Sequence, residues 1–267
     1  MWFSMSIHPT AIIDPSAELD ASVSVGAYTV IESGAQIGAG TEIGPHNVIG
    51  SGTQMGKNNQ TFSGAQIGVL PQDLKHVKGA AGQTIIGDAN VFREFTTISS
   101  STVYASDAPG AKQTRIGNGC LFMATTHVGH DCTVGNGVIM ANGAALSGHV
   151  TVHDRAILGG ITGIHQFCVI GTMAFVGGMA RVNKDVLPYM LVEGHPARCF
   201  GPNTVGLQRN GLNSEAIQRI RRIYKVIYRS GLNTTQAVAR IQADIEASPE
   251  RDLLLSFIAA SQRGITK

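Results

Sequence analysis

The sequence predicts an all-β parallel β-helix built from six-residue repeats, followed by a small α-helical domain at the C-terminus. Two observations lead to this prediction. Aliphatic residues recur at every sixth position over most of the chain between Ile7 and Val182. After about Pro188 this period stops, and apolar residues follow at helical spacing. We therefore expect the β-helix to span residues 1–190 and the helical domain to span residues 191–267.

The six-residue period is the stronger of the two signals. Counting by six from Ile7 to Ile67 meets an aliphatic residue at every position except Thr61, and a second run from Ile116 to Val182 is apolar throughout. A small residue usually occupies the fifth position of each hexad. One short flat strand per hexad and three hexads per coil give a triangular coil, and stacked coils bury a continuous core. Adjacent coils should lie about 4.8 Å apart.

Two segments break the count, at residues 71–85 and 104–115. The second contains the turn-forming sequence Ser106-Asp107-Ala108-Pro109-Gly110, which is typical of an exposed loop. Loops that leave a regular scaffold often carry binding and catalytic residues. The two loops are therefore candidates to carry functional residues.

The C-terminal domain shows three helix signals. Asn213-Ser214-Glu215 is a helix start, apolar residues follow it at helical spacing, and Gly231 marks the end. Thr234 or Thr235 can begin a second helix. Ser248-Pro249-Glu250 begins a third, with proline in the first turn, where the helix tolerates it.

Composition excludes several classes of protein. The net charge is only +2, which does not favour a nucleic-acid partner, and no apolar run is long enough for a membrane span. Met1 to Ile13 lacks a signal-peptide pattern, and Met5 begins a stretch typical of an alternative start. The four cysteines form no metal-type pairs, which fits a reducing compartment. We expect a cytoplasmic protein with no resident metal and no stable membrane insertion.

The three-hexad coil predicts a cluster of histidines. The hexads that begin at Val128, Leu146 and Ile164 should stack on one face, which places four of the nine histidines along one edge (His127, His130, His149 and His165). Gly148 follows His130 by three hexads and should be its neighbour one coil along. A reaction in which a hydroxyl attacks a carbonyl needs a general base, and histidine has a suitable pKa range. His130 is the candidate base, with Asp131 or a backbone carbonyl to orient its ring and the Gly148 N–H to stabilise an oxyanion.

Other interpretations of these residues stay open. Three histidines at a subunit interface can hold zinc, as in carbonic anhydrases built from the same repeat. An isolated histidine on such a prism is usually a solvated surface residue, which we expect for His8, His46, His76 and His153. The inward positions of Cys120, Cys132 and Cys168 indicate core packing rather than metal binding.

Five motifs closely resemble those of the UDP-N-acetylglucosamine O-acyltransferases. They are the run from His127 to Gly135, Gln72-Asp73-Leu74-Lys75, Ser147-Gly148-His149-Val150, His165-Gln166-Phe167-Cys168, and the run from Tyr224 to Gly231. The resemblance extends over essentially the whole chain from Ile7. It implies a left-handed coil and a homotrimer with sites between neighbours. It also implies transfer of an (R)-3-hydroxyacyl group from acyl carrier protein to the 3-position of UDP-N-acetylglucosamine, the first step of lipid A biosynthesis. No cofactor is implied beyond the phosphopantetheine that enters with the donor.

The resemblance also implies roles for individual residues. His130 would be the general base and Gly148 the oxyanion donor. Asp73 would contact the glucosamine and Lys75 a phosphate of UDP, with Gln72 beside them. The nucleotide sugar would be positioned by His127, His149 and Gln166, and His165 would line the same cleft. Gly178 would lie at the end of the acyl groove, and Asn203 and Arg209 would contact the nucleotide and the pantetheine arm. The chain departs from the family at Val205, where an acid is frequent, and at Asn210, where a base is frequent, so the details of uracil recognition stay open.

The segment from Arg198 to Arg229 carries seven Lys or Arg residues against one acid, Glu215. Such a basic surface would steer the acidic acyl carrier protein, although a solvated helix face explains some of these charges equally well. Three alternatives remain. The related UDP-sugar N-acyltransferase carries an extra domain before its hexads, whereas the hexads here begin at Ile7. A zinc carbonic anhydrase would contain stoichiometric metal, and a structural or ice-binding β-helix would show regular threonine rows. Acyl chain length and a 3-hydroxyl or 3-amine on the acceptor stay open.

Overall fold

The computed structural model describes residues 7–108 and 110–267. The predicted alternative start at Met5 therefore lies outside the described residues. The same is true of residues 1–6 of the segment tested for a signal peptide, and of Pro109 in the second predicted loop.

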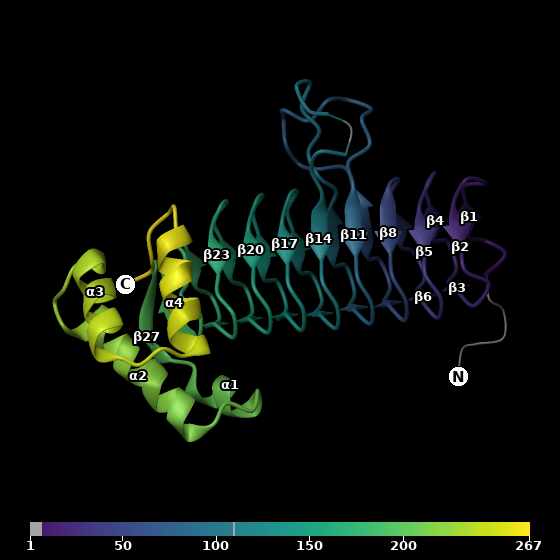
Figure 1. Ribbon diagram of the computed structural model, residues 1–267. Coiled ribbons are helices and arrows are strands. Elements are labelled where there is room, and N and C mark those ends of the chain that lie inside the picture. Colours follow the sequence, from purple (N-terminus) through teal and green to yellow (C-terminus); the bar gives the residue numbers. More distant parts are fainter. Residues whose placement is uncertain (1–6, 109) are drawn as a thin grey trace.

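The chain winds into a left-handed parallel β-helix with three flat sheets and a helical C-terminal domain at one end (Figure 1). The predicted fold class is confirmed. Sheet 1 contains β1 (Ile12–Ile13), β4 (Val30–Ile31), β7 (Val48–Ile49), β10 (Gln66–Val69), β13 (Thr97–Ser99), β16 (His127–Val128), β19 (Ala145–Leu146), β22 (Gly163–Ile164) and β25 (Arg181–Val182). Sheet 2 contains β2 (Glu18–Leu19), β5 (Gln36–Ile37), β8 (Thr53–Met55), β11 (Thr84–Ile86), β14 (Thr114–Ile116), β17 (Thr133–Val134), β20 (Thr151–Val152) and β23 (Val169–Ile170).

Sheet 3 contains β3 (Ser24–Val25), β6 (Glu42–Ile43), β9 (Gln60–Thr61), β12 (Val91–Phe92), β15 (Leu121–Phe122), β18 (Ile139–Met140), β21 (Ile157–Leu158), β24 (Phe175–Val176), β26 (Met190–Gly194) and β27 (Ala197–Pro202). The chain passes from sheet 1 to sheet 2 to sheet 3 in every coil. The three turns of a coil therefore stack into three edges of the prism, which we call the 1–2, 2–3 and 3–1 edges.

The register between coils is the predicted three hexads. Val128 pairs with Leu146, and Leu146 pairs with Ile164, in parallel. In a typical two-residue strand the first side chain faces outward and the second is buried, so one hexad contributes one aliphatic residue to the core. Thr61 also points inward, and its buried hydroxyl oxygen has a hydrogen-bond partner, because Oγ1 accepts from the Gly44 N–H at 3.1 Å.

Both long loops leave the prism at the 1–2 edge and project together from its side (Figure 1). The first connects β10 to β11 and the second connects β13 to β14. The predicted ranges 71–85 and 104–115 each include two residues that lie in β11 or β14. Counting by six marks the inward aliphatic residue and misses the paired residues that precede it.

The end of the prism is closed by β26, which continues sheet 3 beside β24, and by β27, which pairs antiparallel with β26. The predicted boundary between residues 190 and 191 lies within β26. Four helices follow: α1 (Thr204–Arg209), α2 (Ser214–Arg229), α3 (Thr234–Asp244) and α4 (Pro249–Ala260). Asn213, Asn233 and Ser248 cap the last three helices at their N-termini, close to the predicted starts. In the described part of the chain, no helix is long and apolar enough to cross a bilayer.

Candidate active site at the 1–2 edge

The histidines predicted to cluster all lie at or beside the 1–2 edge. His127 is on β16, and His130 and Asp131 form the turn after it. Gly148 and His149 form the same turn one coil along. His165 and Gln166 form it one coil further. The parallel pairing of β16, β19 and β22 is what stacks these turns.

His130 and Asp131 form a hydrogen-bonded dyad. His130 Nδ1 lies 2.7 Å from Asp131 Oδ2, and the side chains are 17% and 6% exposed. Asp131 adopts a left-handed turn conformation with φ of 58°, and its backbone N–H donates to Thr114 Oγ1 at 2.9 Å. Because the aspartate occupies Nδ1, the other ring nitrogen of His130 is left for chemistry.

The edge of the His130 ring that carries Nε2 packs directly over Gly148. A Cβ added to Gly148 would lie 2.5 Å from both Nε2 and Cε1 of His130, which is closer than real Cβ contacts. The neighbouring backbone is tied to the same residue, because the His149 N–H donates to the His130 carbonyl at 2.9 Å. Within the described residues, the Gly148 N–H donates to no acceptor. A backbone donor thus lies beside the candidate base, where a developing oxyanion could use it.

Two further histidines flank the dyad. The His149 ring meets the His130 ring edge-on at 5.0 Å and stacks on Phe167 at 4.8 Å. Its Nε2 is 3.7 Å from Asp131 Oδ2, which is beyond hydrogen-bond distance. His127 Nδ1 lies 2.7 Å from Thr97 Oγ1 on the preceding coil. Burial lowers the pKa of His127, with a further contribution from His130, and burial is also the main cause that lowers the pKa of His149.

These lowered pKa values predict acid sensitivity. The unfolded chain binds protons at the ordinary histidine pKa near 6.5, whereas folded His127 and His149 bind them only at lower pH. The unfolded state therefore holds more protons in the window below about pH 6.5, and stability falls as pH decreases through it. We expect the melting temperature, measured at fixed protein concentration, to fall between pH 7.5 and pH 5.5. His127→Gln should reduce that fall, and an equal fall in the variant would contradict the prediction.

The two loops bring Asp73 and Lys75 to the side of the dyad. Asp73 Oδ1 accepts a hydrogen bond from the Lys75 backbone N–H at 2.9 Å, which is the main cause that lowers the pKa of the Asp73 carboxyl. Asp73 Oδ2 accepts from the Tyr104 hydroxyl at 3.2 Å and lies 3.4 Å from Thr102 Oγ1. The side chains of Gln72 and Lys75 are exposed. Asp73 is thus a charged acceptor fixed at the mouth of the site.

The remaining predicted residues are distributed less compactly. His165 and Gln166 are exposed, and His165 Nδ1 lies 3.1 Å from the Gln166 carbonyl oxygen, so His165 shares the edge but not the dyad. Gly178 is in the turn after β24, on the 3–1 edge. Asn203 caps α1 and donates to the Met173 carbonyl at 3.0 Å, on the 2–3 edge, and Arg209 ends the same helix. One chain therefore presents the predicted residues on three different edges.

Comparisons with known proteins identify the family of this chain. A family model described as UDP-N-acetylglucosamine O-acyltransferase, domain 2, matches residues 185–266, and a bacterial transferase hexapeptide model matches residues 113–148. The acyl-[acyl-carrier-protein]–UDP-N-acetylglucosamine O-acyltransferase of Anaeromyxobacter dehalogenans strain 2CP-1 is 48% identical over 263 residues, 98% of this chain and 100% of that protein. The chain belongs to the UDP-N-acetylglucosamine O-acyltransferase family.

Solved structures of this family superpose over nearly the full chain. The enzyme from Acinetobacter baumannii gives a TM-score of 0.92 at 41% identity, covering 98% of this chain and 100% of that one. UDP-N-acetylglucosamine O-acyltransferase from Moraxella catarrhalis gives 0.92 at 38% identity with the same coverage. The resemblance inferred from the motifs is confirmed for both the prism and the helical domain.

Four residues at this edge were given no role in the site from the sequence: Thr102, Tyr104, Lys112 and Phe167. Phe167 follows His149 by three hexads, so the coil length could have placed it. Thr102, Tyr104 and Lys112 lie in or beside the second loop, where no periodicity applies and only the folded backbone reveals their contacts.

The dyad is less suited to a metal ion than to hydrogen bonding. His130, Asp131 and His149 each offer one donor atom, all within 4.8 Å of one another. Two ligands of a tetrahedral zinc ion with bonds of about 2.0–2.1 Å lie about 3.3 Å apart. The 2.7 Å between His130 Nδ1 and Asp131 Oδ2 is a hydrogen-bond distance instead. Within one chain, the arrangement of these three residues favours an acid–base pair over a zinc site.

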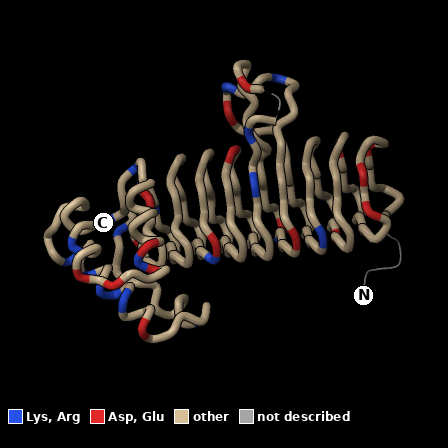
Figure 2. The backbone as a smooth tube through the Cα atoms, in the orientation of Figure 1, with Lys and Arg blue, Asp and Glu red and all other residues tan. Residues whose placement is uncertain are grey.

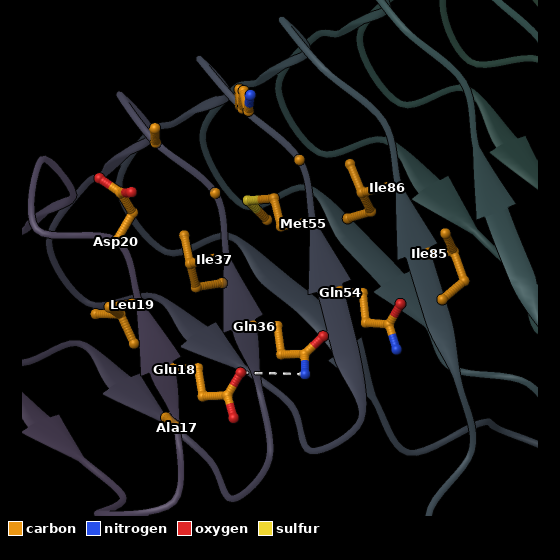
Figure 3. Close-up of a pocket in the computed structure, with 14 residues that line it drawn as sticks. Ala17, Glu18, Leu19, Asp20, Gln36, Ile37, Gln54, Met55, Ile85 and Ile86 are labelled. Carbon is orange, nitrogen blue, oxygen red and sulfur yellow. Dashed lines mark hydrogen bonds between the residues drawn. The ribbon is translucent and has the colours of Figure 1, made fainter.

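A depression of about 950 Å³ lies on the outer face of sheet 2 over β2, β5, β8 and β11, on coils that precede the clustered histidines. Figure 3 shows its polar side chains in a row on successive strands, with Gln36 Nε2 donating to Glu18 Oε2 at 3.3 Å. Because this trough lies along the face of a flat sheet and its lining contains no histidine, it is not a candidate for the catalytic site.

Proposed function

We propose that this chain transfers an (R)-3-hydroxyacyl group from acyl carrier protein to the 3-hydroxyl of UDP-N-acetylglucosamine, the first step of lipid A biosynthesis. The observation that carries the proposal is the His130–Asp131 dyad stacked on Gly148 at the foot of two loops, in a member of the O-acyltransferase family. An ester forms on the sugar and a thioester is broken on the donor.

The chemistry follows from the dyad. His130 Nε2 takes the proton of the sugar 3-hydroxyl as its oxygen attacks the thioester carbonyl carbon. Asp131, bonded to Nδ1, orients the imidazole and stabilises its protonated form. The Gly148 N–H donates to the oxyanion of the tetrahedral intermediate. When the intermediate collapses, the pantetheine thiolate leaves and receives the proton from His130. The donor thioester is already activated, so no protein nucleophile is needed.

The acceptor would bind along the 1–2 edge. Asp73 would accept hydrogen bonds from the glucosamine, and Lys75, exposed on the same loop, would neutralise a phosphate of UDP. The other polar side chains of this edge would line the path of the nucleotide sugar: Gln72, His127, His149, His165 and Gln166. Burial keeps His127 and His149 uncharged near neutral pH, so they would act as hydrogen-bonding groups rather than as cations.

The three-edge distribution of residues supports a homotrimer. Sheet 3 presents an outward row of half-buried apolar side chains on consecutive paired strands: Val91, Leu121, Ile139, Ile157, Phe175 and Leu191. An apolar row of this kind is suited to burial against another copy. Packing of neighbouring copies would bring the 1–2 edge of one beside another edge of the next, so that Gly178, Asn203 and Arg209 reach a shared cleft. The Cβ position of Gly178 meets only Gly160, with its carbonyl oxygen at 3.4 Å, which leaves room for an acyl chain.

The helical domain would receive acyl carrier protein. Lys and Arg residues gather there, while the prism carries few (Figure 2). Of the seven between Arg198 and Arg229, Arg219 is the only one that forms an ion pair within the described residues, with Glu215 and Glu250 at 2.9 Å each, and the other six are exposed. Such a surface attracts an acidic carrier at long range. We also propose that the protein acts in the cytoplasm without a cofactor of its own, since the phosphopantetheine arrives on the donor.

The direct test is an assay of purified protein with UDP-N-acetylglucosamine and 3-hydroxyacyl carrier proteins of several chain lengths. We expect a product heavier by one acyl group, with the ester at the 3-position by NMR. An acceptor that carries a 3-amine in place of the 3-hydroxyl separates O- from N-transfer. Failure to acylate either acceptor with any donor would contradict the proposal.

A further inference from the structure

Thr102 contacts two carboxylates at once. Its backbone N–H donates to Asp131 Oδ2 at 3.3 Å, and its hydroxyl donates to Asp73 Oδ2 at 3.4 Å. The residue is 1% exposed, although it begins a surface loop. Asp131 is the partner of the base, and Asp73 lies on the other loop, far earlier in the sequence. Thr102 is thus a single buried residue that hydrogen-bonds both to Asp73, the proposed contact of the acceptor sugar, and to Asp131 of the dyad.

Tyr104 completes the contact with Asp73. Its hydroxyl donates to Asp73 Oδ2 at 3.2 Å, and its own position is fixed from both sides of the loop. The Tyr104 N–H donates to Asp107 Oδ2 at 2.9 Å, Asp107 pairs with Lys112 at 2.9 Å, and Lys112 Nζ lies 3.7 Å from the centre of the Tyr104 ring. This closed circuit of backbone, ion pair and cation–π contact holds the hydroxyl in place.

The carboxylate of Asp73 is therefore oriented as well as charged. Oδ1 accepts from the Lys75 N–H, and Oδ2 accepts from both Tyr104 and Thr102. An ionised carboxylate has about four acceptor directions, so the three protein donors leave about one for a ligand. Asp73 would therefore accept a hydrogen bond from a hydroxyl of the acceptor sugar in one direction only, which would fix the sugar relative to His130.

We propose that Tyr104 and Thr102 are positioning residues: the second loop holds Asp73 and Asp131 as one hydrogen-bonded unit, so that the group that receives the acceptor sugar is aligned with the base that deprotonates it. This inference rests on the proposed acyl transfer to UDP-N-acetylglucosamine. Tyr104 acts through Asp73 alone, whereas Thr102 acts on both carboxylates.

The test compares Tyr104→Phe with Thr102→Val in steady-state kinetics. Tyr104→Phe removes one hydroxyl and keeps the ring beneath Lys112. It should raise KM for UDP-N-acetylglucosamine about tenfold, the effect of one hydrogen bond to a charged group, with kcat and the KM for acyl carrier protein within about twofold. Thr102→Val keeps the shape and the N–H. It should raise the same KM and also lower kcat, because the N–H to Asp131 loses its anchor on Asp73.

A double-mutant cycle shows through which residue Tyr104 acts. In an Asp73→Ala background, Tyr104→Phe should have no further effect, since the group that it positions is gone. Tyr28→Phe, in an exposed ring on the second coil of the prism, is the matched control and should retain wild-type kinetics. A Tyr104→Phe variant with unchanged KM, or one with an undiminished effect in Asp73→Ala, would overturn the inference while wild-type turnover stands. Absence of turnover in the wild-type protein would instead reject the proposed function.

Discussion

His130→Ala should lower kcat about a thousandfold while the fold survives. The expected loss lies within the range for removal of a general base, since the sugar hydroxyl is not acidic enough to attack a thioester without one. The ring lies on the 1–2 edge over Gly148, outside the hydrophobic core of the prism. Single-turnover kinetics with pre-loaded acyl carrier protein would report the chemical step, and circular dichroism would report the prism.

His153→Ala is the matched control for this variant. That histidine is also partly buried, but it packs edge-on against Phe257 of α4, at 5.8 Å between ring centres, on the 2–3 edge. We expect the control to retain turnover even if its melting temperature falls. Residual activity above about a tenth of wild type in His130→Ala would remove His130 as the base, because general bases contribute at least about a hundredfold.

Gly148→Ala should lower kcat about a hundredfold through one added methyl group. The new Cβ would lie 2.5 Å from His130 Nε2, and the backbone that carries it is fixed by the coil register, so the imidazole has to rotate away. Rotation of the imidazole breaks the 2.7 Å contact with Asp131 and moves His130 Nε2 away from the acceptor hydroxyl. In addition, the new methyl group itself would lie beside the Gly148 N–H that would stabilise the oxyanion. Steady-state kinetics and a crystal structure of the variant would check both effects.

Gly163→Ala is the matched control for this methyl group. An added Cβ there meets nothing within 4 Å, and the paired position one coil earlier is already Ala145. We expect this variant to keep wild-type kcat. Wild-type kcat in Gly148→Ala as well would show that the close packing of His130 on Gly148 has no part in catalysis.

The sequence predicts what depends on the coil length and leaves open what depends on the loops. A strict three-hexad register sufficed to stack His130, Gly148 and Gln166 on one edge, because each coil repeats the backbone of the last. The same count misplaced the loop limits and gave no hint of Thr102 or Tyr104, since the chain outside the prism has no period. Sequence reasoning also named Asp131 and a backbone carbonyl as alternative partners for His130. The 2.7 Å contact with Nδ1 identifies the carboxylate as the partner.

The C-terminal residues illustrate a second limit. Gly178, Asn203 and Arg209 were associated with the site through family resemblance alone, and in one chain they lie on other edges of the prism. Counting along a single chain cannot bring them to His130. In the proposed homotrimer, a neighbouring copy would bring them to His130, so their proposed roles depend on how the prisms pack.

Activity of mixed oligomers tests most directly the proposal that the active site is shared between copies. His130→Ala and Arg209→Ala would each be inactive or nearly so alone, and the two would be unfolded and refolded together in equal amounts. If each site takes His130 from one copy and Arg209 from its neighbour, random assembly pairs the two intact residues in about a quarter of the sites. We therefore expect about a quarter of wild-type turnover per site in the mixture. Turnover no higher than the average of the two separate variants, in oligomers shown to be mixed by mass spectrometry, would contradict a cleft shared between copies.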